Sequence, residues 1–278
     1  MVALAYRMLG DLARAQDLVQ EAWLRWNAHS DGVVSPKAYL LTMVTRLCLN
    51  ELQSARVRHE QRRPDRLPEP IDLTHGGLSE LEHLEQISMA VMVMLQRLSP
   101  AERAVLLLHD VFDFEHVEIA TLIGKSTPSC RKLLERARRH VAGARRMLPA
   151  DREEHLRLLR SFTEAARLGD TQQLVRMLAD DAIMITDGGP AGRTASGVRN
   201  LTRPLQGAER IANFVARTAT RTAASLAHEE HELNGQPAVV FRQHGTPFAA
   251  LLLVIGGGKV RRVFFHADLT RLRYLARA

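Results

Sequence analysis

The sequence predicts a multidomain protein in which two all-α helical domains precede an α+β domain with a curled sheet. Up to about residue 148, apolar residues recur three or four positions apart, as on one face of a helix. After residue 151, helical patterns give way to apolar runs that are typical of strands. Residues 59–83 hold three prolines and two adjacent glycines among many charges, which indicates a linker. We therefore expect domains at 1–58, 84–148 and 151–278.

The first domain shows two helical patterns. In the first of these, one apolar face is expected to comprise Leu12, Ala15, Val19, Ala22, Trp23 and Trp26. Its polar face holds Asp17, Gln20 and Glu21. Ser35 followed by Pro36 is a cap-then-proline signal that starts the second pattern. The inward residues of that helix are expected to be Leu40, Val44, Leu47 and Leu52.

The second domain contains a helix, a tight turn and a second helix. The first helix is expected to bury Val117, Ile119, Ala120, Leu122 and Ile123. Gly124 suits the left-handed residue just past a helix end. Ser126 or Thr127 can cap the next helix, with Pro128 in its first turn, where a missing N–H costs little.

The second helix of this pair is strongly basic. It carries only Glu135 as an acid, against the basic residues Lys125, Arg131, Lys132, Arg136, Arg138, Arg139, Arg145 and Arg146. A helix, a glycine-containing turn and a basic helix make a helix-turn-helix, whose second helix lies in the DNA major groove. Thr127 and Ser129 can reach phosphates or base edges from its start. The alternative is a helical hairpin with a solvated basic face.

The third domain begins with helical patterns at 153–168 and 171–180 and continues with a strand at 182–187. A glycine- and proline-containing turn at 188–192 and a helix at 207–219 follow. Three strands are expected at 238–243, 248–255 and 259–268, the last two joined by a hairpin at Gly256–Gly258. Helices that lead into a curled antiparallel sheet make an α+β domain.

Composition narrows the class of protein. The formal net charge of +7 fits a polyanionic partner. The two cysteines, Cys48 and Cys130, lack metal-type spacing, so we expect small core residues in a reducing cytosol. No run of about 18 apolar residues and no secretory signal occur. We expect a cytoplasmic protein with no membrane segment, no metal ion and no cofactor.

In this order, the motifs along the chain resemble the extracytoplasmic-function sigma factors of the sigma-70 family, in the subset with a SnoaL-like C-terminal domain. The matching segments are Ala5–Gly10, Asp17–Trp26, Ser35–Leu40, Thr45–Leu49, Leu67–Pro70, Leu98–Phe112 and Cys130–Arg139. The resemblance implies that the first domain is sigma region two, the second is region four, and the third is a SnoaL-like cone-shaped barrel. It implies core RNA polymerase and promoter DNA as partners.

The resemblance also carries residue roles. Asp17, Gln20 and Glu21 match the polymerase-binding helix, although an ordinary solvated face has the same pattern. The residues that match the helix facing the non-template strand at the minus-ten element are Arg46, Asn50, Ser54 and Arg56. Tyr39 could stack on an unpaired base or belong to the core. The residues that match the helix facing the minus-thirty-five element are Arg131, Lys132, Glu135, Arg136 and Arg139.

The sequence departs from the family pattern at several places. It starts at the equivalent of the middle of region two's first helix, for which we expect a start codon placed too far downstream. Asn50 replaces a usual Asp, and Arg66 replaces a usual linker Trp. Two motifs that relate to control by the C-terminal domain are altered at Asp187–Ala191 and at His266–Thr270. They nominate Asp187, Gly188, Gly189 and Asp268 as regulatory contacts.

Three hypotheses for the whole chain follow. In the first, the C-terminal domain is a built-in lid that contacts the helical domains at high effective concentration, and the protein is not an enzyme. In the second, the C-terminal domain binds or converts a small apolar molecule, with acids or bases drawn from Asp187, His244, His266 and Asp268. Phe241, Phe248, Phe264 and Phe265 are expected to fill the barrel. The third, a simple repressor, has no use for the polymerase-binding helix. The sequence favours the first: an initiation factor that directs promoter recognition.

Overall fold

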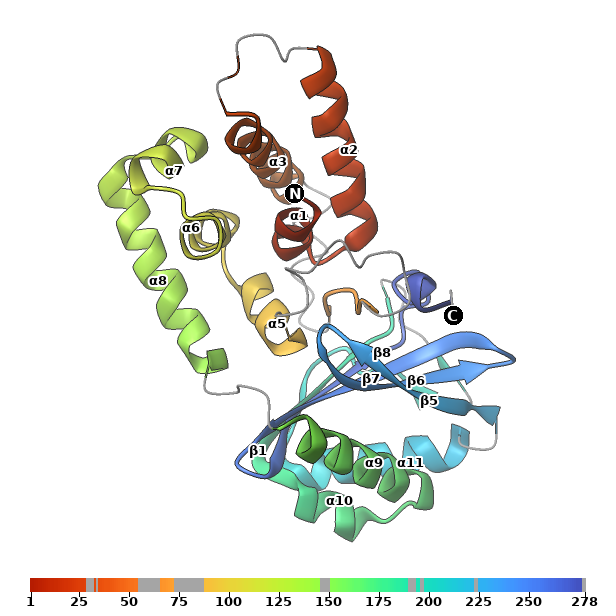
Figure 1. Ribbon diagram of the computed structural model, residues 1–278. Helices are drawn as coiled ribbons and strands as arrows, with labels where there is room; N and C mark the ends of the chain where they lie inside the picture. Colours follow the sequence, from red (N-terminus) through yellow and green to blue (C-terminus); the bar gives the residue numbers. More distant parts are fainter. Residues whose placement is uncertain are drawn as a thin grey trace. The chain divides into compact units, whose positions relative to one another are not determined.

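The computed structural model describes residues 1–28, 33, 35–54, 66–72, 88–145, 151–189, 194–195, 198–222 and 225–276. These residues belong to two compact units, and each is described by itself. The first unit lies within Met1–Arg62 and Val91–Arg145, and the second within Arg63–Ala90 and Arg146–Ala278. Figure 1 colours the chain in sequence order and labels its elements.

The first unit begins with helices α1 (Val2–Leu9), α2 (Leu12–Ala28) and α3 (Pro36–Gln53). The buried stripe of α2 consists of Leu12, Ala15, Leu18 and Ala22. The prediction that Trp23 joins this stripe is wrong, because Trp23 lies beside the stripe and is 50% exposed. Trp26 and Tyr39 are half-buried and pack together, with their ring centroids 5.5 Å apart.

Helices α6 (Pro100–Asp110), α7 (His116–Ile123) and α8 (Thr127–Arg145) follow α5 (Met89–Arg97). Gly124 ends α7 with a φ of 66°, as expected for a left-handed C-cap. Ile119, Ala120 and Leu122 are buried, but Val117 is 65% exposed, so its predicted burial is wrong. Val117 lies in the first turn of α7, at the edge of the stripe that Ile119, Ala120 and Leu122 form.

Arg103 is a fully buried charge in the first unit, and the sequence pattern did not single it out. Its guanidinium donates to the carbonyl oxygens of Met8, Gln96 and Leu98, and to Gln96 Oε1 at 3.1 Å. A buried arginine is stable only when its donors are satisfied in this way. Arg103 therefore joins the end of α1 to the turn between α5 and α6.

The second unit contains helices α9 (Arg152–Leu168), α10 (Thr171–Met177) and α11 (Ala208–Thr222). Its longer strands are β1 (Leu178–Asp187), β5 (Ala227–Leu233), β6 (Gln236–Gln243), β7 (Thr246–Gly256) and β8 (Lys259–His266). Two-residue strands β2 (Thr194–Ala195), β3 (Val198–Arg199) and β4 (Leu205–Gln206) and a 3-10 turn at Arg273–Ala276 complete the described part. The six-stranded sheet has the order β4-β1-β8-β7-β6-β5.

Three details differ from the expectation for this domain. Residues 178–180 begin β1 instead of ending a helix, and β1 pairs with β8 in parallel, so the sheet is mixed. Strand β5 was not predicted because its sequence, AHEEHEL, has few apolar residues, as suits the edge strand of the sheet, which pairs with β6 and bridges to Asp72 at Leu233. The β7–β8 hairpin is confirmed, with Gly257 and Gly258 at φ values of 63° and 70°.

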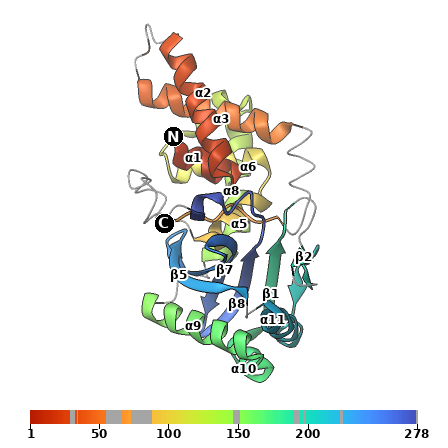
Figure 2. The same ribbon diagram turned by 90° about the vertical axis from the view of Figure 1, so that its right-hand side faces the viewer.

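The two faces of this sheet carry different partners. Helices α9, α10 and α11 cover one face, where they bury a core that includes Phe162, Leu174, Ile211 and Val263. Figure 2 shows these helices together on that side of the sheet. The opposite face holds chain from far upstream in the sequence, residues 66–72, by the contacts described next.

Candidate functional site

Residues 66–72, which we call the linker segment, lie against the sheet of the second unit, and Asp72 forms a β-bridge with Leu233 of β5. Leu67 is 0% exposed and Ile71 is 1% exposed, although the surrounding sequence is rich in charge and proline. The side chains that hold the segment, which we call the linker seat, are Asp187, His231, Asn234 and Arg271. A surface linker would not bury such residues, so this segment is an integral part of the second unit.

The backbone of Leu67 is held on both sides. Its N–H donates to Asp187 Oδ2 at 2.9 Å, and its carbonyl oxygen accepts from Arg271 Nη1. Asp268 supports Arg271, because its Oδ2 atom lies 3.8 Å from Arg271 Nε and both side chains are 10% exposed. Asp268 Oδ1 also accepts from the N–H of Thr270 at 3.1 Å. Asp187 thus holds Leu67 directly, whereas Asp268 acts on Leu67 through Arg271.

The two glycines after Asp187 let its loop approach Asp268. Asp187 Oδ1 accepts the N–H of Gly189 at 3.0 Å, with Gly188 between them. Gly189 has a φ of 81°, and a Cβ there would lie 3.0 Å from the carboxyl carbon of Asp268. Any other residue at 189 would strain the backbone and displace Asp268. Pro190 and Ala191 lie outside the described residues.

Asn234 holds the other end of the linker segment. Its Oδ1 accepts the N–H of Ile71 at 3.1 Å, and its own N–H donates to the carbonyl of Ile71 at 2.8 Å. Asn234 has a φ of 52° in the turn between β5 and β6, a conformation that asparagine tolerates better than most residues. The turn between β5 and β6 therefore also binds the linker segment.

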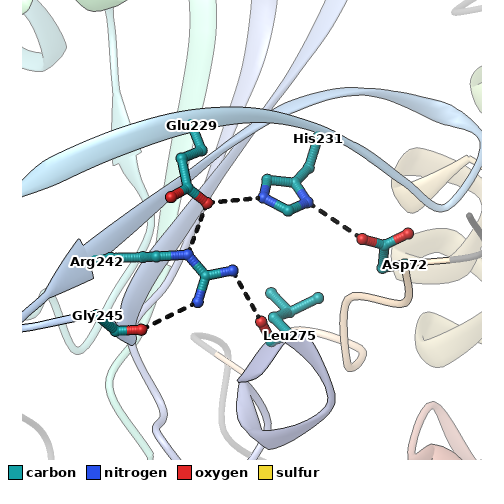
Figure 3. Close-up of polar contacts among 6 residues, drawn as sticks. All are labelled: Asp72, Glu229, His231, Arg242, Gly245 and Leu275. Atoms are coloured by element: carbon teal, nitrogen blue, oxygen red, sulfur yellow. Dashed lines mark hydrogen bonds and ion pairs between the residues drawn. The ribbon is translucent and has the colours of Figure 1, made fainter. Parts of the chain in front are cut away.

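A chain of polar contacts continues from the linker segment across the sheet edge (Figure 3). Asp72 Oδ2 lies 3.1 Å from His231 Nδ1, and His231 Nε2 lies 3.3 Å from Glu229 Oε2. Glu229 accepts from Arg242 Nε at 2.7 Å, and Arg242 donates to the carbonyls of Gly245 and Leu275. Arg242, and after it His231, lower the pKa of Glu229. The network ties the linker segment to the 3-10 turn that follows β8.

A second cluster of charge lies on α8 in the first unit. Cys130, Leu133, Leu134 and Ala137 face inward. The exposed residues are Ser129, Arg131, Lys132, Glu135, Arg136 and Arg139, and Thr127 is half-buried at the helix start. A shallow hollow brings together Lys125, Ser129, Lys132, Glu135, Arg136 and Arg139. The helix places the predicted DNA-facing side chains on one accessible side.

Ion pairs distinguish the arginines of α8. Arg136 pairs with Glu102 at 3.2 Å and Arg138 with Asp110 at 2.5 Å, so both also brace α8 against α6. Arg138, despite the cost of burial, and then His109 lower the pKa of Asp110. Within the described residues, Arg131 and Lys132 take part in no ion pair. These two side chains are the most available for an external anion.

The region-two candidates lie on two helices. On α2, Asp17 and Gln20 are exposed and Glu21 is half-buried; Asp17 lies 3.7 Å from Arg14, and Glu21 lies 2.5 Å from Arg25. On α3, Arg46 and Asn50 are exposed, and Ser54 is the residue just after the helix. Arg56 lies outside the described residues. Each set is accessible.

The four candidate acids and bases do not form a catalytic group. Asp187 accepts from Leu67, Asp268 pairs with Arg271, and His244 lies exposed in the turn between β6 and β7. Burial, and after it the charge of Arg271, lowers the pKa of His266 to about 3, so this histidine is neutral at pH 7. Among the described residues, no group of three or more His, Cys, Asp or Glu side chains could hold a metal ion. None of the described helices has the length and apolar character needed to cross a membrane.

Comparison with known proteins places these features in a family. The chain matches the family models "Sigma-70 region 2" over residues 1–58 and "Sigma-70, region 4" over residues 88–141. It is 31% identical over 275 residues to the probable ECF RNA polymerase sigma factor SigI of Mycobacterium tuberculosis, covering 95% of this chain and 88% of that one. It is 32% identical to the ECF RNA polymerase sigma factor SigJ of the same organism, covering 81% and 72%.

The fold agrees with this relationship over almost the whole chain. The crystal structure of M. tuberculosis SigJ matches with a TM-score of 0.73 and 26% identity, covering 98% of this chain and 94% of that one. The chain therefore belongs to the extracytoplasmic-function sigma factors of the sigma-70 family, as a member with a SnoaL-like C-terminal domain. Such a protein directs promoter recognition by RNA polymerase, and the predicted fold class is confirmed.

Proposed function

We propose that this sigma factor recognises its promoter through α8 and α3 and is controlled by its own C-terminal domain through the linker segment. The observation that carries the proposal is the double hold on Leu67, with Asp187 on its N–H and Arg271 on its carbonyl. We propose the cytoplasm as its location, because the activity takes place where RNA polymerase and DNA are.

The DNA and polymerase contacts are assigned by accessibility and charge. Arg131, Lys132, Arg136 and Arg139, with Thr127, Ser129 and Glu135, face the minus-thirty-five element. Arg46, Asn50, Ser54 and Arg56 face the opened minus-ten strand, which needs positive charge along a backbone path. Asp17, Gln20 and Glu21 meet a basic surface of core polymerase. Most described members of each set are exposed, and Glu21, Ser54 and Thr127 are half-buried, which supports these assignments.

The linker segment can influence both DNA-binding regions because it lies between them in the sequence. Residues 1–58 and 88–141 match the two sigma regions, and residues 66–72 are in the connection. Fixing that segment divides the connection into two shorter tethers, and each tether limits how far its region can move. Holding or releasing the segment therefore changes which arrangements of the two regions are accessible to polymerase and promoter.

The free energy that favours attachment of the linker segment to the C-terminal domain is similar in size to the free energy that opposes it. Burial of Leu67 or Ile71 contributes about 1.5–3 kcal/mol each, and each hydrogen bond adds about 0.5–1.5 kcal/mol. Ordering the backbone opposes this by about 1–2 kcal/mol per residue. Because the opposing contributions are similar in size, a change at a single seat residue can shift the balance between held and released segments.

Catalysis by the C-terminal domain finds no support in the site. His266 is neutral and buried, and Asp187 accepts backbone N–H groups from Leu67 and Gly189. A general acid or base needs a proton acceptor or donor free to reach a substrate. We therefore propose regulation, with the C-terminal domain in contact with the rest of the chain, as its role.

The test compares two aspartates of the same strand. Asp187→Ala removes the acceptor for Leu67, whereas Asp181→Ala removes an exposed carboxylate that pairs with Arg261 at 3.3 Å. We expect Asp187→Ala to raise the exchange rate of the Leu67 amide and to change promoter-dependent transcription, measured at equal occupancy of core polymerase. Asp181→Ala should change neither.

Either direction of change in transcription supports control through the linker segment. A rise means that the held segment inhibits, and a fall means that it maintains the geometry needed for initiation. Faster exchange at Leu67 with transcription identical to the parent protein would contradict the proposal, because the segment would then be released without consequence.

A further inference from the structure

A cavity lies inside the C-terminal domain, on the face of the sheet opposite to the linker segment. Its volume is about 140 Å³, and it is bounded by α9, α11 and the sheet. Its wall is aromatic, with contributions from Phe162, Phe214, Phe241, Phe248 and Phe265. The expectation that phenylalanines fill this barrel is therefore only partly met, because they surround a space and Phe264 points away from it.

The polar groups of the wall indicate an uncharged ligand. The hydroxyls of Thr163, Thr218 and Thr222 donate to backbone carbonyls of their own helices at 2.9, 2.7 and 3.0 Å. Arg167 is half-exposed and pairs with Glu164 at 2.6 Å. A charged ligand would lose its hydration here without a dedicated buried counter-ion, which is costly.

The size of the space indicates a ligand with a single ring. An apolar protein cavity of about 150 Å³ stays dry and binds benzene. The described lining includes no carboxylate and no thiol, and its ionisable side chains, Arg167 and His228, belong to residues that are exposed. The hydroxyl of Thr186, which also lines the cavity, is engaged with the backbone and accepts the N–H of Leu201 at 2.7 Å.

The cavity and the linker seat share two strands. On β1, Thr186 lines the cavity and the next residue, Asp187, holds Leu67. At the end of β8, Phe265 lines the cavity, as does Ala267 just after the strand, whereas His266 and Asp268 alternate with them. Successive side chains of a strand point to opposite faces, so the two sites lie back to back. The N–H of Ala267 also donates to the carbonyl of Asp187 at 2.7 Å, which couples the two segments directly.

We infer that this cavity binds an uncharged, single-ring apolar molecule, and that its occupancy changes the hold of the linker seat on Leu67. A ring placed against Thr186, Phe265 and Ala267 bears on the same backbone that positions Asp187 and Asp268. The binding part of the inference stands alone, and the control part rests on the function proposed above. The site would make the sigma factor responsive to a small molecule.

The test uses fluorobenzene as the probe and the full-length chain. Ala219→Leu fills the cavity from α11, and Ala166→Val fills it less from α9, in case the larger side chain prevents folding. Ala227→Leu is the matched control, because Ala227 is exposed on β5 and does not line the cavity. Binding is followed by fluorine NMR titration, and folding by circular dichroism.

We expect saturable binding to the parent protein and to Ala227→Leu, and at least about tenfold weaker binding to the filled variant. Saturating probe should change the exchange rates of the Leu67 and Ile71 amides at least about threefold in the parent, and leave them unchanged in the filled variant. Absence of saturable binding, or equal binding by the filled variant, would overturn the site. Binding with unchanged exchange would overturn the coupling.

These outcomes are separate from the test of the proposed function. That test measures transcription after Asp187→Ala without any probe. Probe binding can therefore be shown even if transcription is unchanged by Asp187→Ala. Conversely, Asp187→Ala can change transcription even if the cavity binds no probe.

Discussion

Charged residues serve opposite purposes on α8 and at the linker seat. On α8, Arg131 and Lys132 are exposed and take part in no ion pair among the described residues. At the seat, Arg271 and Asp187 are buried and bound to the backbone of a segment that is distant in sequence. Exposed charge keeps its hydration until an external partner replaces it, whereas buried charge must be satisfied inside the protein. We propose that the first kind serves binding to an external partner, whereas the second holds a segment of the same chain.

Buried and exposed charges should therefore differ in how much their removal lowers the free energy of unfolding. Removing a buried, bonded charge leaves partners unsatisfied and costs several kcal/mol, whereas removing an exposed charge changes stability by less than about 0.5 kcal/mol. The following predictions test the contrast, from the largest expected effect on stability to the smallest.

Replacing Arg271 should have the largest effect. Arg271→Ala leaves the carbonyl of Leu67 and the carboxylate of Asp268 without their buried donor, so we expect a loss of about 3 kcal/mol. For a unit of this size, the unfolding midpoint should fall by about 6–12 °C, measured by calorimetry on the full-length chain. Arg261→Ala is the control, because its pair with Asp181 is exposed and should contribute at most about 1 kcal/mol. Similar unfolding midpoints for Arg271→Ala and Arg261→Ala would contradict the expected difference between buried and exposed charges.

His266 should make the stability depend on pH. Its pKa is about 3 in the folded protein and about 6.5 in the unfolded chain, so between these values only the unfolded chain binds the proton. Stability is therefore fully present above pH 6.5 and is lost as pH falls toward 3, by at most about 1.4 kcal/mol per pH unit.

His266→Gln should remove this contribution, so that the variant loses less stability than the parent between pH 7 and pH 5. Urea unfolding at several pH values measures the difference, and His244→Gln in the exposed β6–β7 turn is the control. A variant with the same pH dependence as the parent would show that His266 is accessible to protons in the folded protein.

Alanine at Arg131, Lys132 and Arg136 together should leave the fold intact and weaken DNA binding. Each lost phosphate contact should lower the salt slope of binding by about one, and each lost bidentate base contact should cost about 1–3 kcal/mol. Binding of the holoenzyme to promoter DNA at several salt concentrations measures both effects. Undiminished affinity with an unchanged slope would remove α8 from the DNA interface.

Reversing the charges of Asp17 and Glu21 should have the smallest effect on stability. Their partners, Arg14 and Arg25, lie on the same exposed helix, and such pairs contribute about 0.3–0.5 kcal/mol. Asp17→Lys with Glu21→Lys should nevertheless weaken binding to core polymerase, measured by pull-down. Normal holoenzyme formation by the folded double variant would assign the polymerase contact elsewhere.

Local sequence determined the helical domains. The apolar spacing of α7 and α8, Gly124 between them and the run of basic residues predicted a helix-turn-helix, because a helix fixes which residues share a face. The same reasoning failed at Trp23 and Val117, which lie at the edges of buried stripes, where packing against neighbouring helices decides exposure. It also missed Arg103, because nothing in a helical pattern shows that a charge will find its partners on another helix.

Only the tertiary structure decided the linker seat. Leu67 is 120 residues from Asp187 and 204 from Arg271, and Ile71 is 163 from Asn234. Family resemblance nominated Asp187, Gly188, Gly189 and Asp268, but it assigned their contacts to the helical domains, and it left Asn234, His231 and Arg271 unnamed. Periodicity reports which side of an element faces the core, since it depends on neighbours a few residues away. Which distant backbone meets a buried aspartate depends on how the sheet closes, and no local pattern encodes that.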